Sequence, residues 1–78
     1  MMEAKLVDIT MHLDQRIQSS QLESLRDRLL ATEGVMSADY QSKRPHLMII
    51  GYNPEKINSM EFLRLAEQKG IHAELIGM

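Results

Sequence analysis

Alternation between apolar and polar residues defines the first predicted element of the chain. From residue 7 to residue 13 the odd positions are apolar and the even positions are polar or charged. A period of two predicts a β-strand that buries one face. Three later segments also have strand character: 35–41, 46–52 and 71–76. In the second strand we expect Met36, Ala38 and Tyr40 to share one side.

Apolar residues at helical spacing lie between these strands. The stripe of the first predicted helix comprises Leu22, Leu25 and Leu29, and that of the second comprises Phe62, Leu65 and Ala66. Ser20 followed by Glu23 matches a capping box at the start of the first helix. Asn58 is the expected cap of the second helix. Gly34 and Gly70 supply the left-handed residues that we expect at the two helix ends.

The resulting order of elements is β-α-β-β-α-β, which predicts an α+β fold of the ferredoxin-like type. Right-handed crossovers then place both helices on one face of a four-stranded antiparallel sheet with strand order 4-1-3-2. The length of 78 residues suits one domain, because domains run from about 50 to 250 residues. We therefore assign residues 1–78 to a single domain.

Composition excludes several classes of protein. The chain has no cysteine, which rules out disulfides, thiolate metal sites and cysteine nucleophiles. Its formal net charge of −2 provides no overall positive electrostatic field that would attract phosphate backbones, so we expect no nucleic-acid partner. No apolar run approaches the roughly 20 residues that span a bilayer, and we expect no membrane partner. The first residues lack the order of a signal peptide, which predicts a cytoplasmic location.

Four groups of residues carry a resemblance to a known family. They are Gly34-Val35 with Ala38 and Tyr40, Ile50-Gly51-Tyr52-Asn53-Pro54-Glu55-Lys56, Phe62 with Leu65 and Ala66, and Gly70-Ile71-His72-Ala73-Glu74-Leu75. With these residues the chain resembles the heavy-metal-associated domain, the family of small copper chaperones and of the N-terminal modules of metal-pumping ATPases. The resemblance runs from about Lys5 to Leu75 and implies the fold predicted above.

The chain departs from that family at the metal loop. The family carries a Cys-x-x-Cys pair between the first strand and the first helix, and its two thiolates hold a soft monovalent metal. The corresponding positions here are Gln18 and Gln21. Amides are neutral, hard and weak donors, so they suit neither Cu(I) nor Zn(II). The resemblance therefore implies a degenerate metal loop without a cofactor, on a scaffold for protein–protein interaction or regulation linked to metal homeostasis.

Two histidines keep direct metal binding open as an alternative. His12 lies late in the first strand and His72 early in the last, and these strands should be antiparallel neighbours. Their imidazoles could then face each other on the helix-free side of the sheet. Together with Glu74 they would suit Zn(II), Ni(II) or Cu(II). The competing interpretation is that both are solvated surface residues.

The seven methionines allow two similar interpretations. Met11, Met36 and Met48 fall at predicted buried positions, where methionine fills gaps in a core. The methionines at positions 1, 2 and 78 could instead offer thioethers to Cu(I) from the two chain ends. We expect core filling and unligated termini.

Leu47 and Ile49 point to a contact surface. If the alternate residues of this central strand face the helices, Leu47 and Ile49 project from the helix-free face, where they could seat a partner protein or a second copy of the chain. They could also be scattered surface aliphatics. Sensing of a small ligand at a dimer interface is a third possibility. No nucleophile with its base and no glycine-rich phosphate loop is present, so we do not expect an enzyme.

Overall fold

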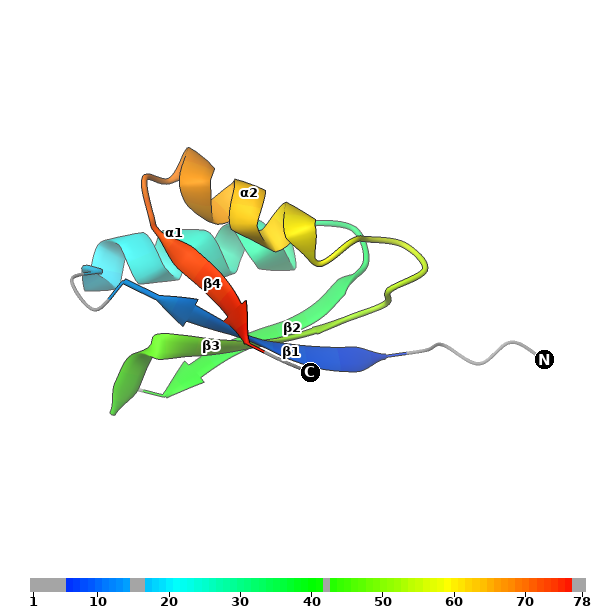
Figure 1. Ribbon diagram of the computed structural model, residues 1–78, viewed down its shortest axis with the longest axis horizontal. Helices are drawn as coiled ribbons and strands as arrows, with labels where there is room; N and C mark the ends of the chain where they lie inside the picture. Colours follow the sequence, from blue (N-terminus) through cyan, green and yellow to red (C-terminus); the bar gives the residue numbers. More distant parts are fainter. Residues whose placement is uncertain (1–5, 15–16, 42, 77–78) are drawn as a thin grey trace.

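The computed structural model describes residues 6–14, 17–41 and 43–76. Within these residues the strands are β1 (Val7–Leu13), β2 (Val35–Gln41), β3 (Arg44–Tyr52) and β4 (Ala73–Ile76), and the helices are α1 (Ser19–Leu30) and α2 (Met60–Gln68) (Figure 1). This order confirms the predicted β-α-β-β-α-β arrangement. Neither described helix is long and apolar enough to cross a membrane.

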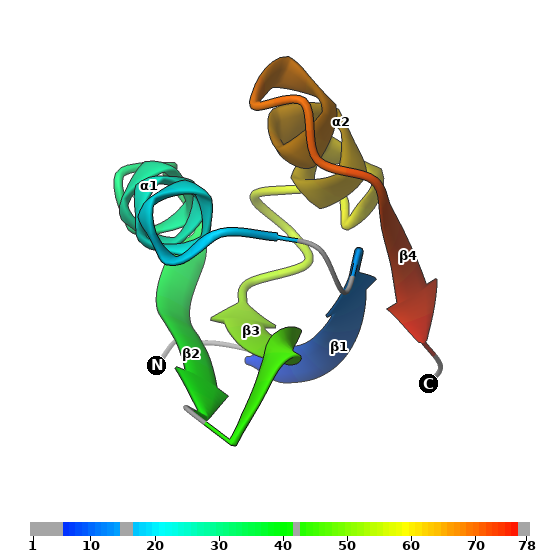
Figure 2. The same cartoon turned by 90° about the vertical axis from the view of Figure 1, so that its left-hand side faces the viewer.

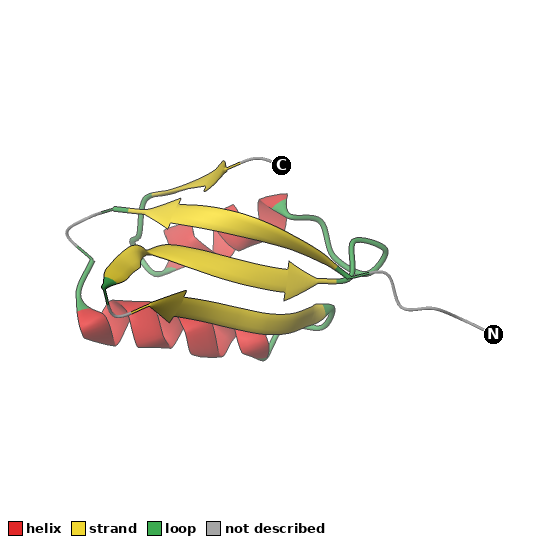
Figure 3. Cartoon of the chain, turned by 90° about the horizontal axis from the view of Figure 1, so that it is seen from below, coloured by secondary structure: helices red, strands yellow, loops and turns green. Residues whose placement is uncertain are grey.

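The four described strands form one antiparallel sheet in the order β2-β3-β1-β4. This is the predicted order 4-1-3-2, read from the other edge. Both helices lie on the same face of the sheet, and its other face carries no helix (Figures 2 and 3). The predicted ferredoxin-like fold is therefore confirmed. The helix-free face is the surface on which the even-numbered residues of β1 lie.

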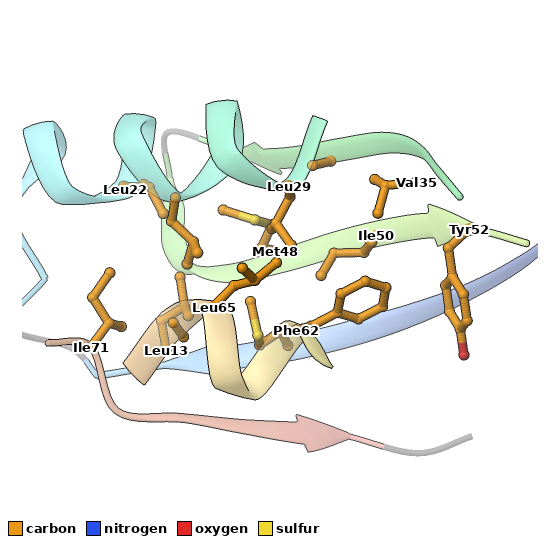
Figure 4. Close-up of a cluster of buried hydrophobic side chains, with 14 residues drawn as sticks. Leu13, Leu22, Leu29, Val35, Met48, Ile50, Tyr52, Phe62, Leu65 and Ile71 are labelled. Atoms are coloured by element: carbon orange, nitrogen blue, oxygen red, sulfur yellow. The ribbon is translucent and has the colours of Figure 1, made fainter. Parts of the chain in front are cut away.

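The core lies between the sheet and the two helices (Figure 4). All six residues of the two predicted helical stripes are buried in it. They pack against Met11 and Leu13 of β1 and Met48 and Ile50 of β3, none of which retains exposed surface. Tyr52 and Phe62 meet edge to face, with their ring centroids 5.0 Å apart. The alternation of apolar residues in the strands and the apolar stripes of the helices therefore identified the central part of the core.

A β-bulge changes the predicted orientation of Met36. The pairing of β2 with β3 moves from Val35 opposite Tyr52 to Ser37 opposite Gly51, so Met36 is one extra residue in β2. An inserted residue reverses the side-chain alternation on either side of it. Val35 is consequently buried, whereas Met36 is 63% exposed. The prediction that Met36 lies on the buried side is wrong for this reason.

The start of α1 also differs from the prediction. The helix begins at Ser19 with Gln18 as its N-cap residue, so Ser20 lies inside the first turn. The side-chain oxygen of Gln21, the third helical residue, accepts a hydrogen bond from the backbone N–H of Gln18 at 3.1 Å. The predicted capping box of Ser20 and Glu23 is therefore wrong. The structure places the capping interaction two residues earlier.

The two glycines predicted at helix ends behave differently. Gly70 has a φ of 73° and follows the C-cap residue of α2. Its N–H bonds to the carbonyl of Glu67 and that of Ile71 to the carbonyl of Ala66, both at 2.9 Å, which is the Schellman pattern. Gly34 also has a positive φ, of 97°, but α1 already ends at Leu30. Gly34 therefore directs the chain into β2 and does not end the helix.

Strand boundaries shift by up to two residues. β3 begins at Arg44, two residues before the predicted start, and β4 begins at Ala73, two residues after it. The late start of β4 follows from the helix end, because the N–H of Ile71 is bound to α2. In β1, Val7 is exposed, so continuous burial of the inner side begins further along the strand.

Candidate functional site

The loop before α1 leads to Gln18 and Gln21, the two glutamines at which the resemblance predicts the family's thiolates. Gln18 is the N-cap residue and Gln21 lies one turn further, so both sit at the helix start. Because the side-chain oxygen of Gln21 accepts the N–H of Gln18, one of the two amides is engaged in capping the helix. The donors available here are neutral amide groups. They do not fit a soft monovalent metal, which selects thiolate or thioether sulfur.

The register of the sheet places the two predicted metal-binding histidines diagonally and not opposite each other. Glu74 lies directly across from His12 on β4. His72 lies two residues earlier, and its carbonyl accepts the N–H of Asp14 at 2.9 Å. His12 and His72 both line a shallow hollow of about 540 Å³ at this end of the sheet. Among the described residues, however, no three histidine or carboxylate side chains converge as a metal site.

His46 is a neighbour of His12 that the sequence did not predict. The two imidazole rings, from β3 and β1, have centroids 5.5 Å apart and stand nearly perpendicular at 82°. Alternation assigns His46 to the side opposite Leu47. However, the β2–β3 pairing jumps from Tyr40 opposite Met48 to Gln41 opposite Arg44, which leaves residues 45–47 out of regular register with β2. The first part of β3 therefore does not follow the alternation on which the prediction relied.

The helix-free face carries the predicted contact residues Leu47 and Ile49. Leu47 lies opposite His12, and Ile49 lies between Thr10 on β1 and Asp39 on β2. Ile49 keeps 49% of its surface exposed. The two side chains share a hollow of about 270 Å³, whose other lining residues are Thr10, Asp39, Tyr40 and Arg44. The structure thus brings the partly buried Leu47 and the exposed Ile49 together on one surface.

Ile76 extends this apolar surface, and sequence reasoning did not select it. It lies across from Thr10 on β4 and is 48% exposed. Ile49, Thr10 and Ile76 therefore form a row across three neighbouring strands. The signal was present in the sequence, because Ile76 has the same parity as His72 and Glu74 on the last strand. We call Leu47, Ile49 and Ile76, with the methyl group of Thr10, the sheet-face patch.

Acidic residues surround the sheet-face patch. Asp39 borders Ile49, Asp8 lies opposite Gly51 and Glu74 lies opposite His12. Arg44 is the basic residue that lines the hollow at Leu47 and Ile49. Around the patch the described structure therefore places three carboxylates and one guanidinium. Its electrostatic field therefore favours basic groups.

The methionines fall into two groups. Met11 and Met48 lie opposite each other on β1 and β3, both fully buried in the core as predicted. Met36 and Met60 are more than half exposed and belong to β2 and α2. The terminal methionines at positions 1, 2 and 78 lie outside the described residues. Within the described part of the chain, methionine therefore serves packing at Met11 and Met48.

Comparison with known proteins relates the chain to others by structure only. No protein-family model and no curated protein sequence matches it. Solved structures do match. Oxidized MerP from Ralstonia metallidurans CH34 has a TM-score of 0.82 at 11% identity, over 94% of this chain and all of that one. The Cu(I)-loaded N-terminal domain of a potential copper-translocating P-type ATPase from Bacillus subtilis has a TM-score of 0.83 at 16% identity, over 94% and 90% of the two chains.

A third similar structure is the yeast copper transporter domain CCC2A. Its TM-score is 0.78 at 16% identity, and the match covers 90% of this chain and 94% of that one. These neighbours are heavy-metal-associated domains, and the chain has their fold over nearly its whole length. The sequence of the chain contains no cysteine at all. It therefore combines this fold with a metal loop that offers no thiolate.

Proposed function

We propose that this chain is a non-enzymatic module on a heavy-metal-associated scaffold and that it works by docking another protein on its helix-free sheet face. The observation that carries the proposal is the sheet-face patch, in which the exposed side chains of Ile49 on β3 and Ile76 on β4 flank Thr10 of β1, with the partly buried Leu47 beside them. Contiguous apolar surface of this kind is typical of interaction sites on soluble domains. The glutamine loop supplies no competing function, because its amides lack affinity for soft metals.

The charge around the patch defines the chemistry of the partner. Asp8, Asp39 and Glu74 surround the apolar centre, and Arg44 is the basic residue at the hollow. A partner with an aliphatic or aromatic anchor flanked by lysine or arginine complements this arrangement. A second copy bound through the same face would bring its acidic groups against these. Charge therefore favours a different, basic protein over a homodimer.

The neighbours in structure suggest where such a partner acts. Two of the similar domains belong to a potential copper-translocating P-type ATPase and to a yeast copper transporter. We infer that the partner is a component of a metal-homeostasis system in the cytoplasm. The module would then contribute recognition or regulation to that system, without carrying the metal in its own loop.

Photo-crosslinking tests this proposal directly. A benzophenone amino acid is placed at Ile49, and a matched control carries it at Met60, which is exposed on α2 and far from the patch. We expect a specific crosslinked product from Ile49 and none from Met60, and we expect Leu47→Asp to remove it in a variant that still melts cooperatively. Equal products from both positions, or a product unaffected by Leu47→Asp, would refute docking on this face.

Metal binding by His12 and His72 is the second candidate function. Its support is that both residues line the same shallow hollow, with Glu74 also in its wall. Calorimetric titration with Zn(II), Ni(II) and Cu(II) tests it. Loss of binding in both His12→Ala and His72→Ala would establish this pair as the ligands. Unchanged binding in His72→Ala would exclude it.

A further inference from the structure

We propose that His12 and His46 form a two-imidazole site for a divalent transition-metal ion such as Zn(II), Ni(II) or Cu(II). The site differs from the family's Cys-x-x-Cys site in its position in the fold, in its ligand type and in the ion that it would bind. It also differs from the pairing of His12 with His72, which the sheet register sets diagonally apart. The observation behind the proposal is the ring contact of His12 and His46 across β1 and β3.

The distance between the rings suits a shared ion. With metal–nitrogen bonds of about 2.0–2.1 Å, two imidazoles bound to one tetrahedral ion have their ring centroids about 5 Å apart. The observed separation is 5.5 Å. The separation therefore suits a shared ion, provided that the ring presenting its face rotates until one nitrogen of each ring points to a common position.

The backbone around the site limits the cost of binding. His12 belongs to the regular β1–β3 ladder, in which it lies opposite Leu47, the residue that follows His46. The two ligands thus come from adjacent paired strands, and no loop has to close around the ion. Both side chains are only partly buried, so water can reach the ion and complete its coordination. Such a site has its backbone in place and is open to water.

The chemistry of the ligands selects the ion. Neutral imidazole suits Zn(II), Ni(II) and Cu(II), whereas Cu(I) prefers sulfur. Glu74 lies across from His12 on its other side, on β4, and is the nearest candidate for a third ligand. The described side chains do not already converge as a three-ligand group, so Glu74 would have to change its rotamer. We therefore expect weaker binding than at a closed four-ligand site.

The three histidines of the chain make the test specific. Imidazole signals of the isotope-labelled protein are followed during titration with Zn(II), and a trace of Cu(II) is then added for paramagnetic broadening. We expect Zn(II) to shift, and Cu(II) to broaden, the signals of His12 and His46 and to leave those of His72 nearly unchanged. Calorimetry on the same samples gives the affinity.

Variants separate ligation from packing. His46→Phe keeps an aromatic ring against His12 but removes the nitrogen, and we expect it to weaken Zn(II) binding about 100-fold or more, beyond the 10–100-fold effect of losing an outer-shell partner. His72→Ala is the control and should bind like the wild type. Absence of Zn(II) binding in the wild type, or wild-type affinity in His46→Phe, would overturn the proposal. Neither result bears on partner docking, which the crosslinking experiment tests without metal.

Discussion

Restoring sulfur to the glutamine loop is the sharpest test of how this chain differs from its structural neighbours. Gln18 and Gln21 occupy the N-cap and the third position of α1 and are already joined by a hydrogen bond. Cysteines at both positions would therefore be adjacent on one helical turn. The unpaired N–H groups and the dipole of the helix start stabilise thiolates there. We predict that the Gln18→Cys/Gln21→Cys double variant binds Cu(I), whereas the wild type does not.

The size of the effect follows from the contact that is lost and the ion that is gained. Removal of the partly exposed Gln21 side chain deletes one capping hydrogen bond, which costs about 0.5–1 kcal/mol. For a domain of this size, 1 kcal/mol lowers the melting temperature by about 4–8 °C. Binding of Cu(I) at 100 times its Kd would stabilise the folded double variant by about 2.7 kcal/mol, which raises its melting temperature by roughly 10–20 °C. The metal-bound double variant should therefore melt above the wild type.

The assay is thermal unfolding under anaerobic, reducing conditions with and without Cu(I). Gln18→Ala/Gln21→Ala is the matched control, because it loses the same cap and gains no ligand. We expect the alanine variant to show the initial loss of stability without a response to Cu(I). If the cysteine variant responds no more than the alanine variant, the loop does not have the geometry of a sulfur site. If the wild type responds as strongly, amides are not what prevents binding.

Two further predictions concern the backbone and the bulge. Gly70→Ala places a Cβ at a φ of 73° with no atom within 4 Å, and it should lower the free energy of unfolding by about 1 kcal/mol. Gly34→Ala places a Cβ at a φ of 97° and 2.9 Å from the Ile57 side chain, and it should lower the free energy of unfolding by at least about 2 kcal/mol. Equal losses for the two variants in urea denaturation would contradict this. Met36→Lys should change stability by no more than about 0.5 kcal/mol, while Met48→Lys buries a charge and should prevent cooperative unfolding. A large loss for Met36→Lys would disprove the bulge.

Most of the fold was predictable because it follows from local periodicity. The alternation of apolar residues in β1 shows which face of the strand is buried, and the leucine stripe of α1 shows which face of the helix is buried. The ferredoxin-like topology brings these two faces together. The error at Met36 has a different origin. A bulge is a property of two paired strands, β2 and β3, and the sequence of β2 alone does not reveal it. The cap at Gln18 was missed because Ser20 is the stronger capping residue by type.

The candidate site was only partly predictable for the same reason. The sheet-face positions of Leu47 and Ile49 follow from alternation because both residues keep a regular register with β1, and the structure places both there. The neighbour of His12 could not be predicted, because it depends on the irregular start of the same strand. His46 contacts His12 although alternation assigns it to the side of the strand opposite Leu47. To predict a site whose side chains come from two paired strands, one therefore needs the pairing register as well as the residue types.

The most direct test of the central claim compares the two surfaces once crosslinking at Ile49 has identified the partner. Affinity for that purified partner is measured for the wild type, for Leu47→Asp and for Gln18→Ala/Gln21→Ala, each confirmed as folded by its melting curve. We predict that Leu47→Asp weakens binding about 30-fold or more, equivalent to the roughly 2 kcal/mol of a central interface residue, and that the loop variant binds within about twofold of the wild type. Loss of affinity in the loop variant with no effect of Leu47→Asp would show that the module acts through the glutamine loop and not through the sheet-face patch.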